Sequence, residues 1–432
     1  MEIIIHRGKD QIGGNIIEIT TQKTRILLDA GRELDEEEVR LPEIDGLFDR
    51  PAFDAVFISH YHGDHIGLAY YIDKSISIYL GEASTRIVQA ADAYKRTETI
   101  HPAGFLIHGK PIRVGDITVT PFLCDHSAFD SYMLLCEADG ETILYTGDFR
   151  ANGRKSFDRL MHDLPGKVDK LICEGTTLSR EGYVPVTEAE LEEQAVAMFK
   201  ETKGPVFVLQ SSANIDRIVT MYRAARRTGR IFLQELFMAE LATAAGGSIP
   251  NPAFDDVYAF ITNPKRYDAL TKYRRIGKEG ITKSRFVMCV RTSMLRYMQS
   301  LSEQMPFDGG LLIYSMWSGY RRQPEMDAFL RTCEEMGLRV VELHTSGHAD
   351  ADTIRKLIAH VHPGEVIPVH TENAAWFQTI KSEAAADQKR ELYDRQVALL
   401  DTFLEHRAIS QEQYDKSLLD LTVKMGMATS HE

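Results

Sequence analysis

The segment HYHGDH at residues 60–65 holds three histidines and one aspartate, and it directly follows the apolar run AVFIS at 55–59. A strand that ends in a loop brings several side chains close to one point. Imidazole and carboxylate groups together suit borderline cations such as zinc. The pattern therefore favours a metal site at a strand end over a solvated polar loop. The candidate ligands in this segment are His60, His62, Asp64 and His65.

The surrounding elements are short strands. Up to about residue 175, runs of four to eight residues rich in Ile, Val, Leu, Tyr and Thr recur between turns, and a capped helix is expected over 187–203. From Gly204 strand and helix segments alternate, which predicts a parallel βαβ sheet. After about Leu338 the first pattern returns, with a helix at 352–361. The last fifty residues are expected to be helical.

These changes of pattern predict stacked sheets covered by helices, interrupted by an α/β insert and followed by a helical segment. The expected fold class is α/β. The expected domains are 1–203, an insert at 204–335, a return to the first domain at 336–385, and a helical C-terminal segment at 386–432.

Composition places the chain among folded proteins. It has 432 residues, 44% of them hydrophobic and 26% charged, which excludes long disorder and fibrous repeats. No run of about 18 apolar residues occurs and the N-terminus lacks a signal-peptide pattern, so no membrane association and a cytoplasmic location are expected. The five cysteines are scattered without CxxC spacing, which argues against a thiol metal site or a disulfide framework.

Charge is segregated along the chain. The whole sequence carries −13, which by itself argues against a polyanionic partner. The stretch 204–330 nevertheless holds 17 Lys and Arg against 11 Asp and Glu, a net charge of +6, which leaves −19 for the rest. Solvated helix faces would explain this surplus equally well. A nucleic-acid partner would therefore face the insert, and its binding is expected to be weaker, confined to the cleft, and less dependent on salt than binding to a uniformly basic protein.

HYHGDHIG is similar to the H-x-H-x-D-H signature of the metallo-β-lactamase superfamily. The segments GGN at 13–15, ILLDAG at 26–31, CDHS at 124–127 and TGDF at 146–149 also resemble motifs of that superfamily. This resemblance covers most of residues 1–175 and implies an αββα sandwich. It implies two divalent ions, zinc with manganese as the alternative. The implied ligands are His60, His62 and His126 for the first ion, Asp64 and His65 for the second, and Asp148 between them.

Further motifs resemble the β-CASP nucleases, a group within this superfamily that includes the ribonuclease J family and the cleavage-factor endonucleases of RNA 3′-end processing. The segments are CEGTT at 173–177, SGHA at 346–349 and PVHT at 368–371, placed around an α/β insert. The resemblance implies an inserted β-CASP domain. It makes Glu174 the motif A acid, where ribonuclease J proteins more usually carry Asp, and His348 the motif B residue. His370 would be the motif C residue and the last metal ligand, which favours RNA over DNA.

Each implied role is chemically plausible. Glu174 could accept the second ring N–H of a metal-bound imidazole. His348, beside Ser346, could bind the scissile phosphate or protonate the leaving oxygen. The alternatives are a strand-end carboxylate for Glu174, a helix-cap residue for His348 and a core histidine for His370. The expected catalytic residues are Asp64, Glu174 and His348.

The insert offers candidate substrate contacts. Ser211, Asn214 and Arg217 follow the strand VFVLQ and resemble an S-N-x-x-R stretch of ribonuclease J proteins, although an ordinary helix cap explains them as well. Ser346 and His348 complete the expected substrate-binding set. Tyr314, Trp317 and Tyr320 would stack on bases or belong to the core. His162 is expected at the surface and His344 in a structural role.

The prediction is a metal-dependent ribonuclease that hydrolyses RNA phosphodiester bonds with a water activated between two ions. Single-stranded RNA would lie in the cleft between the lobes. The alternatives are a DNA nuclease of the same fold, a small-molecule ester, thioester or lactam hydrolase, and a non-catalytic RNA-binding scaffold. The C-terminal helices loosely resemble a short helical-hairpin module. Such a module would be a contact or oligomerisation element, for a homodimer or another homo-oligomer, and a plain amphipathic pair of helices is an equal alternative. Whether cleavage is internal or proceeds from the 5′ end is left open.

Overall fold

The computed structural model describes residues 1–34, 38–180, 182–406 and 408–425. The chain forms two compact units, Met1–Glu372 and Asn373–Glu432. The second unit is a helical hairpin of α12 (Ala375–Glu405) and α13 (Gln411–Lys424), as predicted for the C-terminal segment. No helix within the described ranges combines the length and apolar character needed to span a bilayer.

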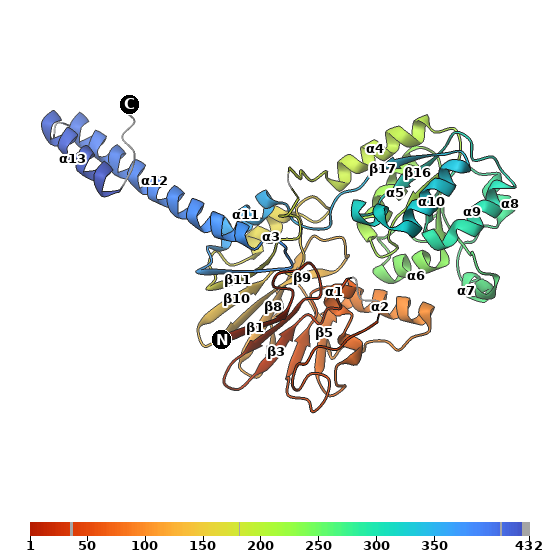
Figure 1. Ribbon diagram of the computed structural model, residues 1–432, viewed down its shortest axis with the longest axis horizontal. Helices are drawn as coiled ribbons and strands as arrows, with labels where there is room; N and C mark the ends of the chain where they lie inside the picture. Colours follow the sequence, from red (N-terminus) through yellow and green to blue (C-terminus); the bar gives the residue numbers. More distant parts are fainter. Residues whose placement is uncertain (35–37, 181, 407, 426–432) are drawn as a thin grey trace. The chain divides into compact units, whose positions relative to one another are not determined.

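The first unit contains a sandwich of two six-stranded sheets, counted over the described residues. The first sheet has the order β1-β2-β3-β4-β5-β6 and the second the order β18-β11-β10-β9-β8-β7 (Figure 1). The strands are β1 (Glu2–Arg7), β2 (Ile16–Thr20), β3 (Arg25–Leu28), β4 (Ala55–Phe57), β5 (Ser77–Gly81), β6 (Gly104–Leu106), β7 (Ile112–Val114), β8 (Ile117–Cys124), β9 (Ser131–Ala138), β10 (Glu141–Tyr145), β11 (Lys170–Glu174) and β18 (Glu365–Val369).

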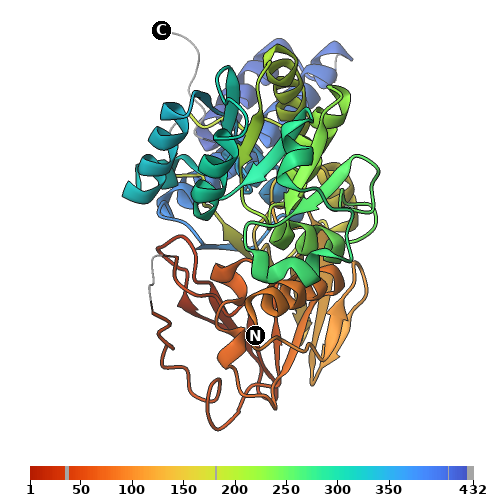
Figure 2. The same cartoon turned by 90° about the vertical axis from the view of Figure 1, so that its right-hand side faces the viewer.

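A third six-stranded sheet, in the described part of the chain, is wholly parallel, as the strand and helix alternation after Gly204 predicts. Its order is β14-β13-β15-β12-β16-β17, and its green to teal ribbons form the insert in Figure 2. The strands are β12 (Val206–Leu209), β13 (Ile231–Glu235), β14 (Val257–Phe260), β15 (Phe286–Val290), β16 (Gly310–Tyr314) and β17 (Leu338–Glu342).

Helices cover the sheets of the first unit. The predicted capping box is present at the start of α4, where Thr187 and Glu190 cap each other's backbone. The helices are α1 (Gly63–Ile66), α2 (Glu82–Lys95), α3 (Phe157–Asp163), α4 (Glu188–Glu201), α5 (Ile215–Arg227), α6 (Leu236–Ala245), α7 (Tyr267–Leu270), α8 (Lys278–Thr282), α9 (Leu295–Ser302), α10 (Pro324–Glu335) and α11 (Ala351–Val361). Four short 3-10 helices lie in the described residues at Ala69–Tyr71, Pro264–Arg266, Thr292–Met294 and Ser318–Arg322.

The core lies between the layers. Ile17 and Ile26 from the first sheet meet Leu134 and Ile143 from the second, and all four are fully buried. Burial of each such side chain stabilises the fold by about 1.5–3 kcal/mol. The α/β architecture with an inserted parallel sheet is confirmed. The domain boundaries remain predictions: the third sheet runs on to β17, and the compact units divide after Glu372.

Strand direction brings the polar loops of the sandwich to one edge. β10, β11 and β18 are parallel neighbours, and β8 runs in the same direction because β9 is antiparallel to both β8 and β10. The carboxyl ends of parallel strands lie at the same edge of a sheet. Glu174 at the end of β11 and the loops that follow the other strands, which carry His126, Asp148 and His370, therefore converge.

Glu18 on β2 is buried in a small polar cluster and predicts acid sensitivity of the sandwich. Burial opposes its ionisation, but contacts with His6 at 2.8 Å and Arg25 at 2.6 Å, together with Thr20, outweigh burial and lower the pKa of the carboxyl to about 2. A carboxyl with a depressed folded pKa stabilises the fold above its unfolded value of about 4.5 and loses that contribution as the pH falls towards 2. A shift of this size corresponds to about 3 kcal/mol.

We therefore expect Glu18→Gln to lower the free energy of unfolding at pH 7 by up to about 3 kcal/mol and to flatten its pH dependence between about pH 4.5 and 2. Urea unfolding at several pH values measures both effects. A Glu137→Gln variant on the exposed side of β9 is the control and should behave as wild type. Equal pH profiles for wild type and Glu18→Gln would contradict the prediction.

Candidate metal centre

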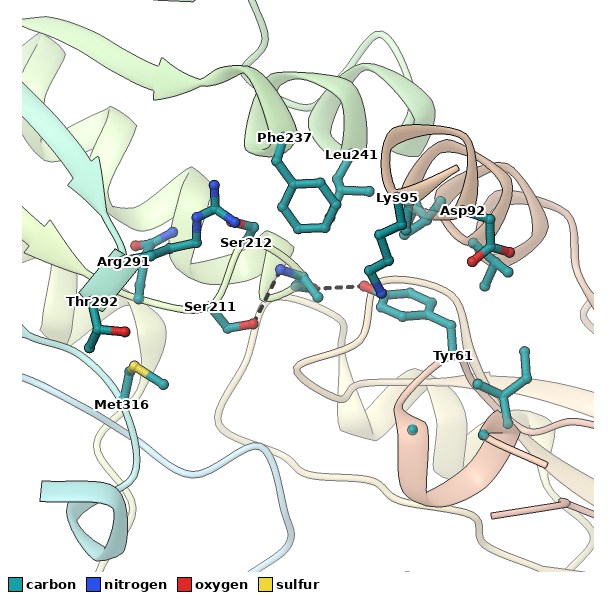
Figure 3. Close-up of a pocket in the computed structure, with 18 of the residues that line it drawn as sticks. Tyr61, Asp92, Lys95, Ser211, Ser212, Phe237, Leu241, Arg291, Thr292 and Met316 are labelled. Atoms are coloured by element: carbon teal, nitrogen blue, oxygen red, sulfur yellow. Dashed lines mark hydrogen bonds between the residues drawn. The ribbon is translucent and has the colours of Figure 1, made fainter. Parts of the chain in front are cut away.

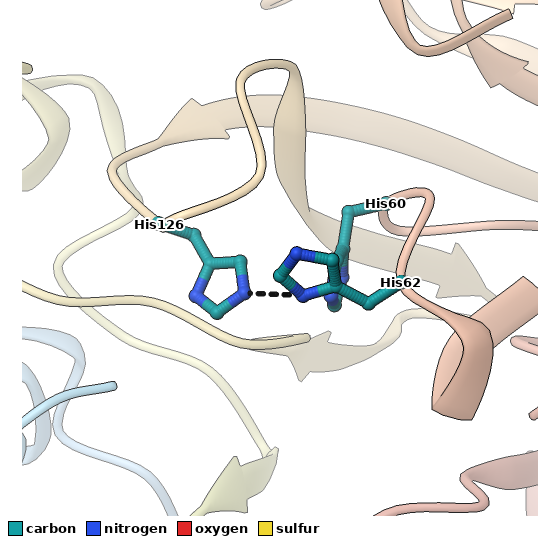
Figure 4. A group of neighbouring side chains, drawn as sticks. All are labelled: His60, His62 and His126. Carbon is teal, nitrogen blue, oxygen red and sulfur yellow. Dashed lines mark hydrogen bonds between the residues drawn. The ribbon is translucent and has the colours of Figure 1, made fainter. Parts of the chain in front are cut away.

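Three predicted ligands form one cluster at the end of the sandwich. His60 and His62 follow β4, and His126 follows β8. One ring nitrogen from each lies within 4.8 Å of those of the others, and Nε2 of His126 lies 3.1 Å from Nδ1 of His62 (Figure 4). Ligands about 2.0–2.2 Å from a shared ion lie about 3–4 Å from one another. The three imidazoles therefore have the spacing of a metal site.

A second cluster lies beside the first and contains Asp64, His65, Asp148 and His370. Nε2 of His65 is 3.2 Å from Oδ2 of Asp148, and Nε2 of His370 is 3.1 Å from Oδ2 of Asp64. Asp148 faces both clusters, because the same Oδ2 lies 3.7 Å from Nε2 of His60. Asp148 is therefore close enough to contribute a carboxylate oxygen to either cluster.

Backbone contacts fix the loop that carries HYHGDH. The amide of Asn15 donates to the carbonyl of Asp64 at 3.0 Å, and the amide of Ala30 donates to that of His65 at 2.8 Å. Gly31 is required at this approach, because a β-carbon there would lie 1.8 Å from the carbonyl oxygen of Asp64. The segments GGN and ILLDAG therefore hold the ligand loop in place.

Asp29 is a supporting residue to which the sequence analysis gave no role. Its Oδ2 lies 2.7 Å from Nδ1 of His65 and accepts a hydrogen bond from Tyr145 at 2.7 Å, while Oδ1 accepts the amide of Ser59 at 2.6 Å. A carboxylate on the second ring nitrogen fixes the tautomer and leaves Nε2 facing the site. The sequence signal for this role was the position of Asp29 in the ILLDAG motif, two residues before Gly31.

His126 and His370 are oriented in the same way by other groups. Nδ1 of His126 lies 2.5 Å from the carbonyl oxygen of Gly347, and Nδ1 of His370 lies 2.8 Å from the hydroxyl of Thr176. His370 also has a left-handed backbone with φ of 51°, held by a 2.7 Å hydrogen bond from its amide to Gly8. Such strained conformations persist where the surroundings fix them and cluster at functional sites.

The electrostatics of the site keep His60, His62 and Asp148 in the forms that bind cations, whereas burial of His65 is outweighed by the carboxylates of Asp148 and Asp29, which raise its pKa well above the usual value. Burial and the neighbouring imidazoles hold the pKa of His60 well below its usual value, and burial lowers that of His62 to about 4. Burial opposes the charge on Asp148 as well, but His370 and His65 outweigh it and keep its pKa well below the usual range. Neutral imidazole and ionised carboxylate are the metal-binding states.

Unpartnered buried atoms test whether these residues fit a metal. Nε2 of His60, Nε2 of His65 and Oδ1 of Asp148 are buried without a hydrogen-bond partner in the described structure. Buried polar atoms are normally paired, so an unpaired set at one place indicates a missing partner. Imidazole and carboxylate donors match zinc. The buried His and Asp clusters are therefore consistent with a metal site.

Glu174 and His348 lie against this site. Oε2 of Glu174 is 3.1 Å from Nδ1 of His348, and it accepts the hydroxyl of Thr176 at 2.6 Å. Glu174 therefore reaches His370 through Thr176 rather than by direct contact with an imidazole of the predicted ligand set. Burial lowers the pKa of His348, but Glu174 and Asp148 outweigh burial and raise it. Its side chain is 20% exposed, so it can reach a bound substrate.

The insert residues predicted to bind substrate lie elsewhere. Asn214 caps α5, where its side chain accepts the amide of Arg217 at 3.0 Å. The guanidinium of Arg217 is fully buried, 3.1 Å from Glu188, and also bonds Ser315. It has no free donor face for a phosphate, so its position favours a structural role. Ser211 is exposed and lines a cavity, so among the three it alone keeps a position open to substrate.

A buried ionic cluster joins the ligand loops to the insert. Arg150, two residues after Asp148, pairs with Asp125 at 2.8 Å and with Asp216 of α5 at 2.5 Å. It also donates to the carbonyl of Ser346 at 3.2 Å. Asp125 precedes His126 and Ser346 is two residues before His348. The cluster therefore sets both the position of the insert and the geometry of the metal site.

A cavity of about 490 Å³ opens between α1 and α2 on one side and the insert on the other (Figure 3). Tyr61, which stands between His60 and His62, forms part of its wall and donates a 2.8 Å hydrogen bond to the carbonyl of Ala213. The cavity contains no predicted metal ligand, but the shared loop places it directly beside them. Further lining residues are Lys95, Gln210, Ser211, Ser212, Phe237 and Arg291.

Other residues fall mostly where the sequence placed them. His162 has an 87% exposed side chain, and the five cysteines are buried and free. Tyr314 is fully buried in the core of the insert, so of the three aromatic residues offered for stacking it belongs to the core. Trp317 and Tyr320 are 47% and 37% exposed.

Comparisons with known proteins agree with this geometry. Residues 10–172 match the metallo-β-lactamase superfamily, and residues 334–384 match the Zn-dependent metallo-hydrolase RNA specificity domain. A crystal structure of a protein of unknown function from Enterococcus faecalis V583 has the same fold, with a TM-score of 0.69, 23% identity, and coverage of 86% of this chain and 94% of that one.

Ribonucleases are among the related sequences. Ribonuclease J of Sinorhizobium meliloti is 23% identical over 80% of this chain, and the match covers 62% of that protein. Ribonuclease J2 of Bacillus subtilis is 23% identical over 86% of the chain and 69% of its own length. The RNase J-like protein of Methanocaldococcus jannaschii is 30% identical over 50% of the chain and 54% of its own length. The chain thus spans less than two thirds of the Sinorhizobium relative. Residues 10–172 thus match the metallo-β-lactamase superfamily, residues 334–384 match the RNA specificity domain of Zn-dependent metallo-hydrolases, and the chain is distantly related to ribonuclease J.

Proposed function

We propose that this protein is a ribonuclease that hydrolyses RNA phosphodiester bonds with two divalent metal ions. The observation that carries the proposal is the pair of adjacent ligand clusters joined by Asp148, in a chain that also matches an RNA specificity domain. When bound, two such ions supply a nucleophile from water at neutral pH and neutralise charge on the attacked phosphate. His60, His62 and His126 would hold one ion, and Asp64, His65 and His370 the other.

The surrounding residues prepare the site for a phosphodiester. His348 faces Asp148 and Glu174, and its raised pKa favours the protonated ring. A protonated imidazole at this place can donate a hydrogen bond to a phosphate oxygen or a proton to the leaving oxygen. Glu174 holds this ring by Nδ1, which leaves Nε2 as the donor. His348 would thus be a catalytic residue and Glu174 a positioning residue.

The cavity beside Tyr61 gives the substrate a path. It lies between the two lobes of the first unit, and most of its wall is apolar, including Phe237 and Leu241. The polar part of the wall is formed by the cations Lys95 and Arg291, the carboxylate of Asp92 and the hydroxyls of Ser211 and Ser212. Such a lining suits a single strand with its phosphates, whereas a small ester or lactam would use only the metal loops. A strand entering here would meet the clusters at the loop that carries Tyr61.

The test is digestion of one single-stranded RNA labelled at either end, with 5′-hydroxyl and 5′-monophosphate forms compared. We expect cleavage with zinc or manganese and none with excess chelator. The labelled products also distinguish internal cleavage from progress along the strand. Intact RNA together with turnover of single-stranded DNA, a chromogenic ester or a lactam would replace the proposal with one of those activities. A metal content below one ion per chain, together with RNA that is bound but not cleaved, would indicate a binding scaffold.

His348→Ala is expected to lower the rate of RNA cleavage by about 100-fold or more, because removal of a general acid typically costs 10²–10⁴-fold. The metal content should stay that of wild type, because the predicted ligands are untouched. Single-turnover cleavage and metal analysis of the same sample measure the two effects. His162→Ala, at a largely exposed histidine, is the control. Loss of both metal and activity would make His348 a ligand instead.

A further inference from the structure

The positive charge of the insert is concentrated in one short segment. Residues 264–285 contain eight Lys and Arg and two acids, a net charge of +6, which equals the net charge of the whole stretch 204–330. This segment includes α7 and α8, which lie towards the right in Figure 1. The rest of that stretch is therefore neutral overall. We call residues 264–285, with the tyrosines that contact them, the basic patch.

The basic patch covers the edge of the third sheet. β14 is an edge strand, and Arg274 and Ile276 pair with it through backbone hydrogen bonds to Ala259 of 2.8 and 3.1 Å. Tyr267 on α7 is 51% exposed and Lys272 is 56% exposed. The segment is thus joined to the sheet edge at Arg274 and Ile276, and it presents Tyr267 and Lys272 to solvent.

Tyrosine rings alternate with these cations. The guanidinium of Arg275 lies 5.6 Å from the ring centre of Tyr267, and that of Arg266 lies 4.5 Å from the ring of Tyr94. Three more pairs of this kind belong to the patch: Lys272 with Tyr273, Arg274 with Tyr258, and Lys278 with Tyr297. Guanidinium groups and aromatic rings both stack on nucleic-acid bases, while the cations attract phosphates.

Most of the charge is not neutralised by neighbouring acids. Ion pairs connect Arg274 with Asp255 at 3.0 Å, Lys272 with Glu240 at 3.0 Å, and Lys283 with Glu279 at 2.7 Å. The remaining five cations of the patch have no ion-pair partner among the residues that the structure describes. They are Lys265, Arg266, Arg275, Lys278 and Arg285. In a chain of net charge −13, this surplus marks a site for a polyanion.

The basic patch meets the cavity at α2. Arg266 donates to the carbonyl of Tyr94 at 2.7 Å, and the next residue, Lys95, lines the cavity. Tyr94 also contacts Glu235, which pairs with Arg291 in the cavity wall at 2.7 Å. A single-stranded RNA that leaves the cavity past Lys95 would therefore pass directly onto Arg266 and Tyr267.

We propose that the basic patch is a second binding site for single-stranded RNA, which holds the part of the strand that lies outside the cavity. The inference rests on the proposed function for its choice of RNA. Stacking on tyrosine and arginine requires unpaired bases, so the patch selects single strands over duplexes. A long RNA contacts both the patch and the metal loops, whereas a very short one reaches the metal loops alone.

The experiment compares Lys265→Ala/Arg275→Ala, which removes two exposed cations without an ion-pair partner in the described residues, with the parent in a His348→Ala background, in which we expect RNA to be cleaved about 100-fold more slowly. Fluorescence polarisation with an RNA of about 25 nucleotides measures affinity at several salt concentrations, and an RNA of about 5 nucleotides is the short probe. We expect about tenfold weaker binding of the long RNA, and a salt slope smaller by about 1.4, since each lost phosphate contact removes about 0.7. Binding of the short RNA should not change.

Matched variants distinguish three contributions to RNA binding: stacking on the Tyr267 ring, cations located in the basic patch, and positive charge anywhere on the surface. Tyr267→Ala should weaken binding of the long RNA about fivefold or more, and Tyr267→Phe, which keeps the ring, should not. Lys110→Ala/Arg113→Ala removes two exposed cations next to and within β7 and should leave binding unchanged. Equal affinity and salt slope for the parent and Lys265→Ala/Arg275→Ala would overturn the proposal. Equal losses of affinity with the short RNA, with an RNA duplex or with the Lys110 and Arg113 control would also overturn it.

The outcomes also separate this proposal from the ribonuclease proposal. Cleavage of the short RNA by the otherwise wild-type chain tests the metal centre alone. If that cleavage occurs and the patch variants bind long RNA as the parent does, the basic patch fails and the ribonuclease stands. If no RNA is cleaved while the patch variants lose affinity as expected, the binding site stands and the ribonuclease fails.

Discussion

Asp148→Asn is expected to reduce RNA cleavage by about a thousandfold or more. Its Oδ2 lies 3.2 Å from His65 and 3.7 Å from His60, which belong to different ligand clusters, and Oδ1 is buried without a partner in the described residues. Asparagine keeps the shape and removes the negative charge that both ions would share. A loss of about 4 kcal/mol of transition-state stabilisation corresponds to about a thousandfold in rate. Single-turnover cleavage and metal content per chain measure the effect.

Asp139→Asn is the matched control for this substitution. Asp139 stands in the exposed Asp-Gly turn between β9 and β10, with φ of 53°, a conformation that asparagine also adopts readily. It should keep wild-type activity, metal content and thermal stability. Folded Asp148→Asn with wild-type cleavage would contradict the assignment of Asp148 as the bridging ligand. Folded Asp148→Asn with two ions and no cleavage would assign it to the chemistry rather than to metal retention.

Glu188→Gln is expected to destabilise the first unit by about 3–5 kcal/mol. Glu188 opens α4, is fully buried and lies 3.1 Å from Arg217 and 3.4 Å from Arg150, and it accepts the hydroxyl of Thr220 at 2.6 Å. Burial opposes its ionisation, but the two guanidinium groups outweigh burial and lower its pKa to about 2. Removing one member of a buried ionic cluster leaves the others charged and unpaired, which costs about 3–5 kcal/mol.

Thermal and urea unfolding followed by circular dichroism measure this effect. Glu193→Gln on the same helix is the control, because Glu193 is 65% exposed and its pair with Arg227 contributes only about 0–1 kcal/mol. Because Arg150 also bonds the carbonyl of Ser346 near His348, we expect lower activity of Glu188→Gln below its melting temperature as well. Equal stabilities of the two variants would show that the cluster contributes no more than a surface pair.

The metal loops show which ligands can be predicted from local sequence pattern and which cannot. HYHGDH after an apolar strand predicts converging ligands, because three histidines within one short loop cannot lie far apart. His126, Asp148 and His370 are separated from that loop by up to about 300 residues, and only the resemblance placed them. Their convergence follows from strand direction in the second sheet, where β8, β10 and β18 all end at one edge. Local hydrophobic periodicity does not predict which strands pair when they are this far apart in the sequence.

Arg217 shows where motif reasoning stops. The stretch Ser211–Arg217 indicates an anion site at a helix N-terminus equally well as an ordinary cap, because both use the same residue types. The structure turns the guanidinium inward to Glu188, a residue of α4 that no local pattern connects with α5. The contacts of Thr176 with His370 and of the Gly347 carbonyl with His126 could not be predicted from the sequence either. A hydroxyl or a backbone oxygen carries no sequence signal that it orients an imidazole.

The sequence by itself determined the α/β class, the order of the layers, the candidate ligands near His60, and a positive surplus in the insert. These properties depend on residue type and on spacing along the chain. Only the tertiary structure decided which cations of the insert face solvent and that five of those in the basic patch lie over tyrosine rings. It also decided that the guanidinium groups of Arg150 and Arg217 are buried and neutralise buried acids. Whether a charge is paired or displayed depends on neighbours that are distant in sequence, and folding alone brings those neighbours together.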